Sequence, residues 1–424
     1  MELGTGGRGL SLVNIAAGLP NAMNKLGDTS LRVEEMQGLY GPFTFSEKLL
    51  QQIWARGDFD HSNLTANDGR RLQVVQPGRW NLLGGPDFKD ARLKFDDGPV
   101  ITGDVELHLC ADDWAAHGHA ADPAYDNVRL HVVLFPAGAE QATAGGQGRS
   151  VPTVVLLPCL HHGLEEYAAE AAIEGLAGRP LNRLMELLRQ LPTAELVAEL
   201  HACAEARWRQ KVHFARLRIG RLGWDDACHH AALEILGYRF NRASMLRVAA
   251  QFPLPAWAGG EVDLDQIHAS EAGRWSMQGV RPANHPKTRL RQYGAWIAAT
   301  SDWPAQLAAS VTTLPTLPMV APTGEVRRKH WLGALRTAWA SQLCAGAVGG
   351  TRLDNLVCDG WLPMLSARTG KDLAGLWHHW FPGDQPPVMI KALRELGLFD
   401  GRSNPACQGA LQGLMGRWLA TGTQ

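Results

Sequence analysis

A tight-turn signal near residue 97 constrains this chain more than any other feature. The pair Asp97-Gly98 stands between two segments in which apolar and polar residues alternate, residues 91–95 and 100–109. An Asp-Gly pair between alternating segments is typical of a β-hairpin. The sequence therefore predicts two antiparallel strands joined at this turn.

Polar residues gather on one face of the second predicted strand. Side chains alternate between the two faces of a strand, so Asp104, Glu106 and His108 share one face and the apolar residues between them share the other. Asp87 enters the neighbouring strand close by, after Gly84-Gly85-Pro86. Hard divalent cations bind clusters of carboxylate oxygens. The pattern predicts an Mg²⁺ or Mn²⁺ site at Asp87 and Glu106, with Asp104 supporting it or facing water.

This arrangement resembles the PD-(D/E)XK nuclease core, the restriction-endonuclease-like fold. In that core an Asp after a Pro, and a Glu two residues before a Lys, hold the metal and organise water. Pro86-Asp87 matches the first part and Glu106-Leu107-His108 matches the second, with His108 at the position where Lys is usual. The resemblance implies metal-dependent phosphodiester hydrolysis, in which Asp87 and Glu106 are metal ligands and His108 orients or deprotonates the attacking water.

A helix that precedes the sheet often supplies an auxiliary carboxylate in this fold. The matching residue is Glu47, in the first turn of a helix predicted over residues 45–54 with Ser46 as its N-cap. A negative charge at a helix N-terminus is also favoured by the helix dipole alone. We favour that simpler interpretation of Glu47.

A longer stretch resembles a bacterial family catalogued as domain of unknown function 2851. The resemblance runs from about residue 40 to the C-terminus. The segments that carry it are 84–88, 103–108, 113–119, 122, 125–128 and 130–133, then 281–286 with Arg289 and Gln292, and 404–409.

Histidines are concentrated around the same strands. Four of the chain's 16 histidines fall within residues 104–131. We expect His117 and His119, with Asp122, to contact substrate or to support the metal site. A zinc hydrolase that uses these imidazoles is the alternative. His131 lies in an apolar segment and is predicted to be a hydrogen-bonded core residue.

Basic residues form local patches in a chain whose formal net charge is −1. Arg207, Lys211 and Arg218 lie near one stripe of a predicted helix, and Arg281 and Arg289 belong to a second patch. Such patches could contact a DNA or RNA backbone, although a row of charges is more often only a solvated helix face. Because the net charge is close to zero, no long-range electrostatic field attracts nucleic acid, and any such binding must use the local basic patches.

Composition and the absence of common motifs narrow the classes of protein to which this chain can belong. The 424 residues include seven cysteines without a Cys-x-x-Cys pair, which favours reduced thiols and a cytoplasmic location. No apolar run reaches the length of a membrane span, so we expect no membrane partner. The chain has no Gly-x-Ser-x-Gly, no dinucleotide fingerprint and no His-Glu-x-x-His motif. The oligomeric state is left open.

The predicted organisation has three parts: a flexible extension over residues 1–39, a nuclease-like α/β domain over 40–163 and a helical domain over 164–424. Further strands are predicted at 72–76, 128–135 and 151–157, and helices at 181–190, 193–222, 225–236 and 243–251. The expected fold class is α/β, with a restriction-endonuclease-like mixed sheet followed by a mostly α-helical C-terminal domain. The expected function is a metal-dependent nuclease. The alternative is a non-catalytic nucleic-acid- or protein-binding scaffold that kept the fold, since His108 replaces the usual Lys.

Overall fold

The computed structural model describes residues 35–37, 44–136, 143–145, 149–176, 179–277, 280, 282–400 and 404–421. Among these residues, every helix is too short or too polar to cross a membrane. Most of the predicted extension, and the predicted site residue Arg281, lie outside the described residues. Within that extension, β1 (Glu35–Gln37) pairs with β2 (Thr44–Ser46) in antiparallel fashion.

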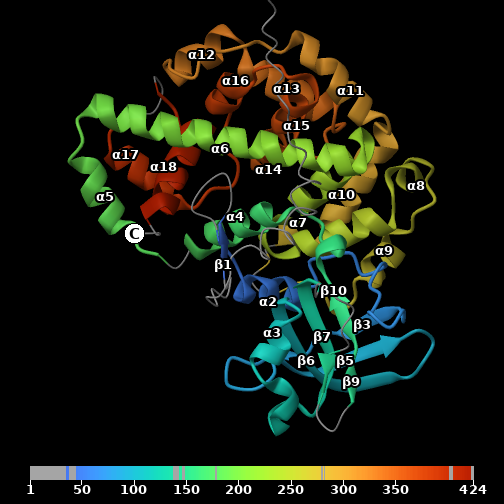
Figure 1. Ribbon diagram of the computed structural model, residues 1–424. Coiled ribbons are helices and arrows are strands. Elements are labelled where there is room, and N and C mark those ends of the chain that lie inside the picture. Colours follow the sequence, from blue (N-terminus) through green and yellow to red (C-terminus); the bar gives the residue numbers. More distant parts are fainter. Residues whose placement is uncertain are drawn as a thin grey trace, which may run out of the picture.

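A mixed sheet forms the N-terminal part of the structure (Figure 1). Its strands follow the order β10-β7-β6-β5-β3, with β4 paired to β5. The β3–β5 and β5–β6 pairs are antiparallel, whereas β6–β7 and β7–β10 are parallel. The strands are β3 (Leu72–Gln76), β4 (Arg79–Trp80), β5 (Phe88–Phe95), β6 (Val100–Cys110), β7 (Val128–Phe135) and β10 (Thr153–Val155), and a small separate pair is β8 (Thr143–Ala144) with β9 (Ser150–Val151).

The predicted hairpin is confirmed, because β5 and β6 pair across the turn at Asp97-Gly98. The strand predicted over 151–157 is instead split between β9 and β10 at Pro152 and ends where a 3₁₀ turn begins at Leu157. Proline has no N–H to donate to a neighbouring strand, which explains the interruption.

Strand β6 is buried on both faces. Val105, Leu107 and Leu109 pack in the main apolar core, as the alternation predicts. The opposite face, with Asp104, Glu106 and His108, is also buried. A solvated polar face is therefore wrong for this strand, and its polar groups need partners within the protein.

Two elements enclose the sheet next to these groups. Helix α2 (Glu47–Arg56) packs against β6, and the Ser46 hydroxyl accepts a hydrogen bond from the Leu49 N–H, which confirms the predicted N-cap. The connection between β6 and β7 contains α3 (Asp113–Ala116) and the 3₁₀ turns η1 (His119–Ala121) and η2 (Pro123–Tyr125).

The rest of the chain is mostly helical and lies above the sheet in Figure 1. Its helices are α4 (Leu164–Gly175), α5 (Asn182–Arg189), α6 (Thr193–Leu222), α7 (Trp224–Gln251), α8 (Leu254–Ala258), α9 (Leu264–Ser270), α10 (Pro286–Ala299), α11 (Trp303–Ser310), α12 (Thr323–Lys329), α13 (Leu332–Gln342), α14 (Gly350–Asn355), α15 (Leu362–Thr369), α16 (Ala374–His379), α17 (Pro387–Glu395) and α18 (Gln408–Thr421). Shorter turns are η4 (Leu157–Cys159), η6 (Pro282–Asn284), η7 (Val311–Thr313) and the π-helical turn η8 (Leu356–Trp361).

Helix α7 is interrupted where the sequence predicts a gap between two helices. Tyr238 has φ 55° and ψ −163°, and Asn241 is also non-helical. A positive φ is unfavourable for a residue with a Cβ. The Tyr238 ring lies under the Arg352 guanidinium, 4.6 Å from the ring centroid, which holds this residue in place.

The apolar core consists of two clusters, and the division between them falls inside α6. One cluster joins the sheet, α2, α4, α5 and the N-terminal part of α6 to α17 and α18. The other contains residues of α6 from Ala204 onward, together with residues of the helices from α7 to α16. Secondary structure changes near residue 163, but the packing continues across it.

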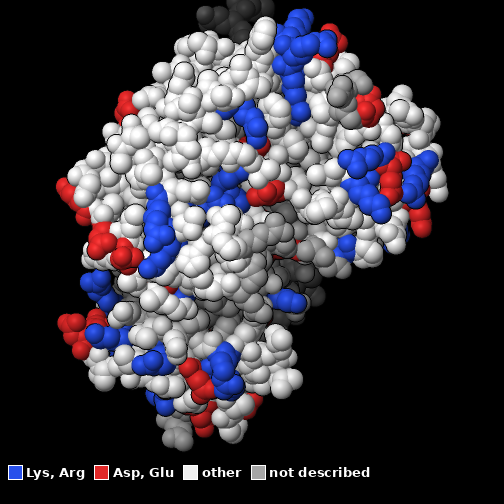
Figure 2. Space-filling model, turned by 180° about the vertical axis from the view of Figure 1, so that it is seen from behind, with Lys and Arg blue, Asp and Glu red and all other residues white. Residues whose placement is uncertain are grey.

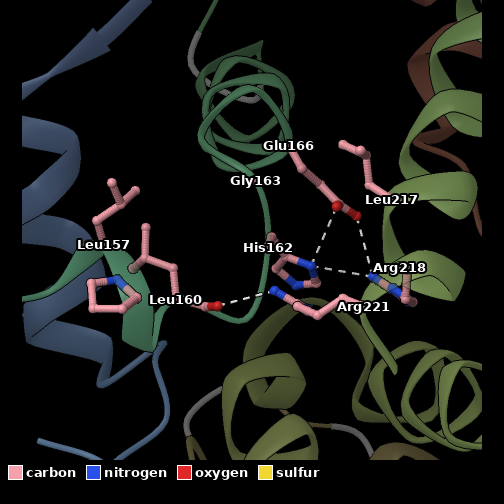
Figure 3. Close-up of a pocket in the computed structure, with 9 residues that line it drawn as sticks. Leu157, Leu160, His162, Gly163, Glu166, Leu217, Arg218 and Arg221 are labelled. Carbon is pink, nitrogen blue, oxygen red and sulfur yellow. Dashed lines mark hydrogen bonds and ion pairs between the residues drawn. The ribbon is translucent and has the colours of Figure 1, made fainter. Parts of the chain in front are cut away.

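A buried network of charged residues joins the segment before α4 to α4, α6 and α7. His162, just before α4, contacts the Glu166 carboxylate at 3.4 Å and the Glu234 carboxylate of α7 at 3.2 Å. Arg218 of α6 pairs with Glu234 at 2.7 Å. It also pairs with Glu166 at 3.2 Å (Figure 3). The neighbouring charged or titratable groups are Asp58, His161, Glu170, Arg221, His230, Arg242 and Arg247.

We expect Leu107→Ala to lower the free energy of unfolding by about 2–5 kcal/mol, because Leu107 is fully buried and its truncation leaves a cavity. Val100→Ala, on the exposed start of the same strand, serves as the control and should change stability by no more than about 0.5 kcal/mol. Urea denaturation measures both. Equal effects would contradict the packing described for β6.

The network also predicts a pH dependence. Two buried carboxylates raise the pKa of His162 from 6.5 to about 10 against the opposing effect of burial. Its stabilisation is therefore complete below pH 6.5 and is lost as the pH rises through 10. His162→Gln should lower the free energy of unfolding by about 1.5–3 kcal/mol, since it removes one charged partner of Glu166 and Glu234, which keep their pairs with Arg218. Between pH 6.5 and 10, the free energy of unfolding should fall less steeply with pH in the variant than in the wild type. Parallel curves would contradict the assignment of this pH dependence to His162.

Candidate metal centre

Asp87 is held by a structured loop between β4 and β5. The Asn81 side chain donates hydrogen bonds to the carbonyls of Gly84 at 3.2 Å and Pro86 at 2.9 Å, and the Asn81 N–H donates to the Asp87 carbonyl at 2.6 Å. Gly85 has φ 91°, a conformation that glycine adopts without strain. The loop therefore fixes the position at which Asp87 enters the sheet.

The carboxylates of Asp87 and Glu106 are joined by reciprocal hydrogen bonds to backbone. The Asp87 N–H donates to Glu106 Oε2 at 2.9 Å, and the Leu107 N–H donates to Asp87 Oδ2 at 3.0 Å. Gln51 of α2 donates to the remaining oxygen, Asp87 Oδ1, at 2.7 Å. The structure thus brings together the two predicted metal ligands from neighbouring strands.

Burial sets the charge of this pair. It raises the pKa of Asp87 to about 7, with a further increase from the negative charge of Glu106. Burial likewise raises the pKa of Glu106 to about 7, although the Asp87 N–H and the charge of Lys89 lower it. A cation placed beside two carboxyl groups with raised pKa values stabilises their charged forms.

Lys89 is the protein cation beside this pair. Its Nζ lies 3.2 Å from Asp104 Oδ2, and Asp104 Oδ1 accepts a hydrogen bond from the Asp90 N–H at 3.1 Å. The β5–β6 register shifts between Phe88 and Ala91, and Asp90 has φ 59°, which marks a β-bulge. Asp104 therefore holds the bulge and Lys89 in place.

Three imidazoles converge with Glu106 on a common point. His108 Nε2 lies 3.1 Å from His117 Nδ1 and 3.3 Å from His119 Nε2. Glu106 Oε1 lies 3.4 Å from His119 Nε2 and 3.6 Å from His108 Nε2. The three imidazole nitrogens all lie within 4.8 Å of one another, the separation of a potential metal-ligand group. His108 comes from β6, whereas His117 and His119 come from the connection after it.

The other nitrogen of His108 begins a buried chain of hydrogen bonds. His108 Nδ1 lies 2.9 Å from His131 Nε2, and His131 Nδ1 lies 3.1 Å from Thr143 Oγ1, which contacts Thr153 Oγ1 at 2.7 Å. His131 is fully buried and hydrogen-bonded, as predicted. Burial lowers the pKa of His108 to about 2 and that of His131 to about 3, and it also lowers the pKa of His119. These imidazoles are neutral near pH 7.

Aromatic rings enclose the cluster. Trp114 of α3 meets His119 edge-on at 5.3 Å, and the Tyr125 ring stacks on His119 at 3.8 Å between centroids. Burial and the carboxylates of Glu106 and Asp87 raise the pKa of Tyr125 to about 12, so it keeps its proton. His117 is exposed and places one side of the cluster at the surface.

Glu47 and Asp122 contribute charge at the edge of the site. The negative charges of both residues act on His119 and favour its protonated form. Asp122 also accepts a hydrogen bond from the Ala124 N–H and so caps η2. Glu47 therefore has an electrostatic effect at the site in addition to the helix-dipole role that we favoured.

The basic residues predicted to contact phosphate have partners inside the protein. Arg207 is buried and donates to Gln210 and Gln412, and Lys211 pairs with Asp359 at 2.7 Å. Arg218 belongs to the network around His162, and Arg289 is buried against Asn284 and Gln292. These four residues do not form an open phosphate-binding face. On the face in Figure 2, Lys and Arg lie in separate groups with Asp and Glu among them.

Sequence reasoning missed four residues of the site. Lys89 stands two residues after Asp87, which is the spacing of side chains on one face of a strand. The sequence therefore contained a signal for this residue. Gln51 acts through one hydrogen bond to Asp87, which is far away in the sequence. Asn81 acts through several hydrogen bonds that depend on the geometry of its loop. Tyr125 lies in a segment that carried the family resemblance, but its stacking on His119 depends on the path of the connection.

The comparison with known proteins gives one match. No curated protein and no solved structure matches the chain. The model of one protein family matches residues 47–270, which contain both strands of the hairpin, the connection with its histidines and the buried ionic network. The late segments at 281–286 and 404–409 lie beyond this match. Since the match covers more than half of the 424 residues, the chain belongs to the family described as protein of unknown function (DUF2851).

Proposed function

We propose that this protein is a metal-dependent hydrolase of phosphodiester bonds in nucleic acid. The observation that carries the proposal is the Asp87–Glu106 pair, in which a half-buried carboxyl group at the start of β5 meets a buried one on β6, next to a cluster of neutral imidazoles. The preference for phosphodiesters rests on the resemblance to the PD-(D/E)XK core and is an analogy of pattern.

The donor groups fit a divalent cation. Carboxylate oxygen and imidazole nitrogen are both ligands for such ions, and the raised pKa values of Asp87 and Glu106 reflect a cost of burial that a cation would offset. When bound, a divalent cation activates water and stabilises negative charge on a phosphoryl oxygen. Glu106 would be a direct ligand, and Asp87 would fix the orientation of Glu106 through its N–H.

Lys89 offers the permanent positive charge that His108 does not supply. His108 is neutral because burial lowers its pKa to about 2, so it cannot replace Lys as a cation. Lys89 stands two residues after Asp87 and lies close enough to lower the pKa of Glu106 by its charge. It would therefore stabilise charge on a bound phosphodiester, while His108 acts as a neutral ligand or acceptor.

The first test removes the carboxylates. We expect Glu106→Gln and Asp87→Asn to reduce metal-dependent cleavage by roughly 10²–10⁴-fold, because each loses a charge that orients the reacting water or the cation. Cleavage should be measured on single- and double-stranded DNA and on RNA, with Mg²⁺, Mn²⁺ or Zn²⁺. Asp97→Asn, in the turn of the hairpin and away from the site, is the matched control and should cleave like the wild type. If the folded wild type cleaves none of these substrates, the hydrolase proposal is rejected and the binding scaffold is favoured.

The second test concerns Lys89. We expect Lys89→Met to lower the cleavage rate by roughly 10²-fold, and Lys89→Arg to retain more activity because it keeps the charge. Thermal melting of each variant separates this effect from a loss of folding, since Lys89 also pairs with Asp104. Full activity in a folded Lys89→Met protein would show that this cation has no role in the reaction.

A further inference from the structure

We propose that His108, His117 and His119 bind a Zn²⁺ ion through one imidazole nitrogen each, with Glu106 Oε1 beside two of these ligands. The proposal concerns metal binding and stands whether or not the chain cleaves phosphodiesters. It replaces the expectation of an Mg²⁺ or Mn²⁺ site at Asp87 and Glu106 with a nitrogen-rich centre next to Glu106.

The spacing of the donor atoms is that of a tetrahedral ion. A Zn²⁺ ion lies about 2.0–2.1 Å from nitrogen and oxygen ligands, which sets neighbouring ligand atoms about 3.3–3.4 Å apart. His108 Nε2 lies 3.1 Å from His117 Nδ1 and 3.3 Å from His119 Nε2, and the three imidazole nitrogens all lie within 4.8 Å of one another. Glu106 Oε1 lies beside this group, 3.4 Å from His119 Nε2 and 3.6 Å from His108 Nε2. These spacings suit one ion held by the three imidazoles.

Hydrogen bonds account for these contacts less well than metal coordination does. Hydrogen bonds from N–H groups span about 2.7–3.2 Å, and three of the four separations exceed this range. His108 Nε2 carries at most one proton, yet it faces two imidazole nitrogens and a carboxylate oxygen. The other nitrogen of the same ring has ordinary hydrogen-bond spacing, 2.9 Å to His131. The two sides of the His108 ring therefore meet different kinds of partner.

The buried chain behind His108 supports the tautomer that a metal requires. When His108 Nε2 is a ligand, the proton of the neutral ring lies on Nδ1 and is donated to His131 Nε2. His131 then donates from Nδ1 to Thr143 Oγ1, and Thr143 donates to Thr153 Oγ1. Each donor along the path has an acceptor. His131 is thus a positioning residue that orients the His108 ring, as the outer partners of metal-bound histidines commonly do.

The donor types set the metal preference. Three imidazoles suit Zn²⁺, whereas Mg²⁺ prefers six oxygen ligands. Both Asp87 oxygens already accept hydrogen bonds, from Gln51 and from the Leu107 N–H. Asp87 therefore acts on the site through Glu106 Oε2, which its N–H holds in place while Oε1 faces the imidazoles.

The experiment measures metal binding by the full chain after removal of metals with a chelator. Titration with Zn²⁺ against a chromophoric competitor should show one ion per chain, and excess Mg²⁺ should not displace it. X-ray absorption of the Zn²⁺-loaded protein should show only nitrogen and oxygen ligands at about 2.0–2.1 Å, with the scattering pattern of imidazole. A wild type that binds no stoichiometric Zn²⁺, or binds it through sulfur, would overturn the proposal.

Variants assign the ligands. His117→Ala and His119→Ala should each weaken Zn²⁺ binding at least 100-fold, and exposed His117 can be removed with the smaller risk to folding, which circular dichroism checks. His330→Ala, at the end of α12, is the control and should bind like the wild type. Unchanged affinity in a folded His117→Ala, His119→Ala double variant would reject the site even if the wild type binds Zn²⁺ elsewhere.

A last pair of variants tests the role of His131. His131→Phe removes the acceptor for His108 Nδ1 and should weaken Zn²⁺ binding by about 10–100-fold. His131→Gln keeps an acceptor oxygen and should recover part of the affinity. The visible spectrum of the Co²⁺-loaded protein should also change in His131→Phe, which a distant structural effect would not produce. Wild-type affinity and spectrum in both variants would remove His131 from the site.

Discussion

The reciprocal hydrogen bonds between Asp87 and Glu106 are the constraint on which the site depends. Each carboxylate accepts a backbone N–H that belongs to the other residue or to its neighbour in the strand. A loop and two strands are thereby joined through side chains, in addition to the ladder of the sheet. Because Glu106 Oε2 is occupied in this way, only Oε1 is directed toward the imidazoles, and the carboxylate cannot rotate freely.

Charge balance gives this geometry its chemical character. Glu106 is buried on the polar face of β6 and Asp87 is half-buried beside it, so desolvation raises the pKa values of both carboxyl groups. Lys89 offsets part of this negative charge, but it is shared with Asp104. Neutral imidazoles add donor atoms without adding positive charge. A site with excess negative charge and several uncharged donors is one that a divalent cation completes.

The sequence predicted the local features of the fold well, because they depend on neighbouring residues. The Asp-Gly turn, the alternation along β6 and the Ser46 cap are each confirmed by contacts within a few residues or across one hairpin. The pairing of Asp87 with Glu106 followed from the same hairpin and the family-like pattern. Alternation alone, however, could not show that the polar face of β6 is covered, because the cover comes from a connection with little regular structure.

Contacts between distant segments show the limit more clearly. A helical stripe with Arg207 and Arg218 has the same spacing whether it faces water or another helix, and here the partners Gln412 and Glu234 lie far away in sequence. His117 and His119 were expected to contact substrate or to support the metal site. Their convergence with His108 depends on the fold of the β6–β7 connection, which periodicity does not describe.

The division of the apolar core inside α6 has a consequence for biosynthesis. The N-terminal part of this helix packs with α18, which follows it only after all the helices from α7 to α17. During synthesis the apolar surface of α6 therefore stays uncovered until the last helix of the described chain has been made. Transiently exposed apolar surface of this kind favours aggregation.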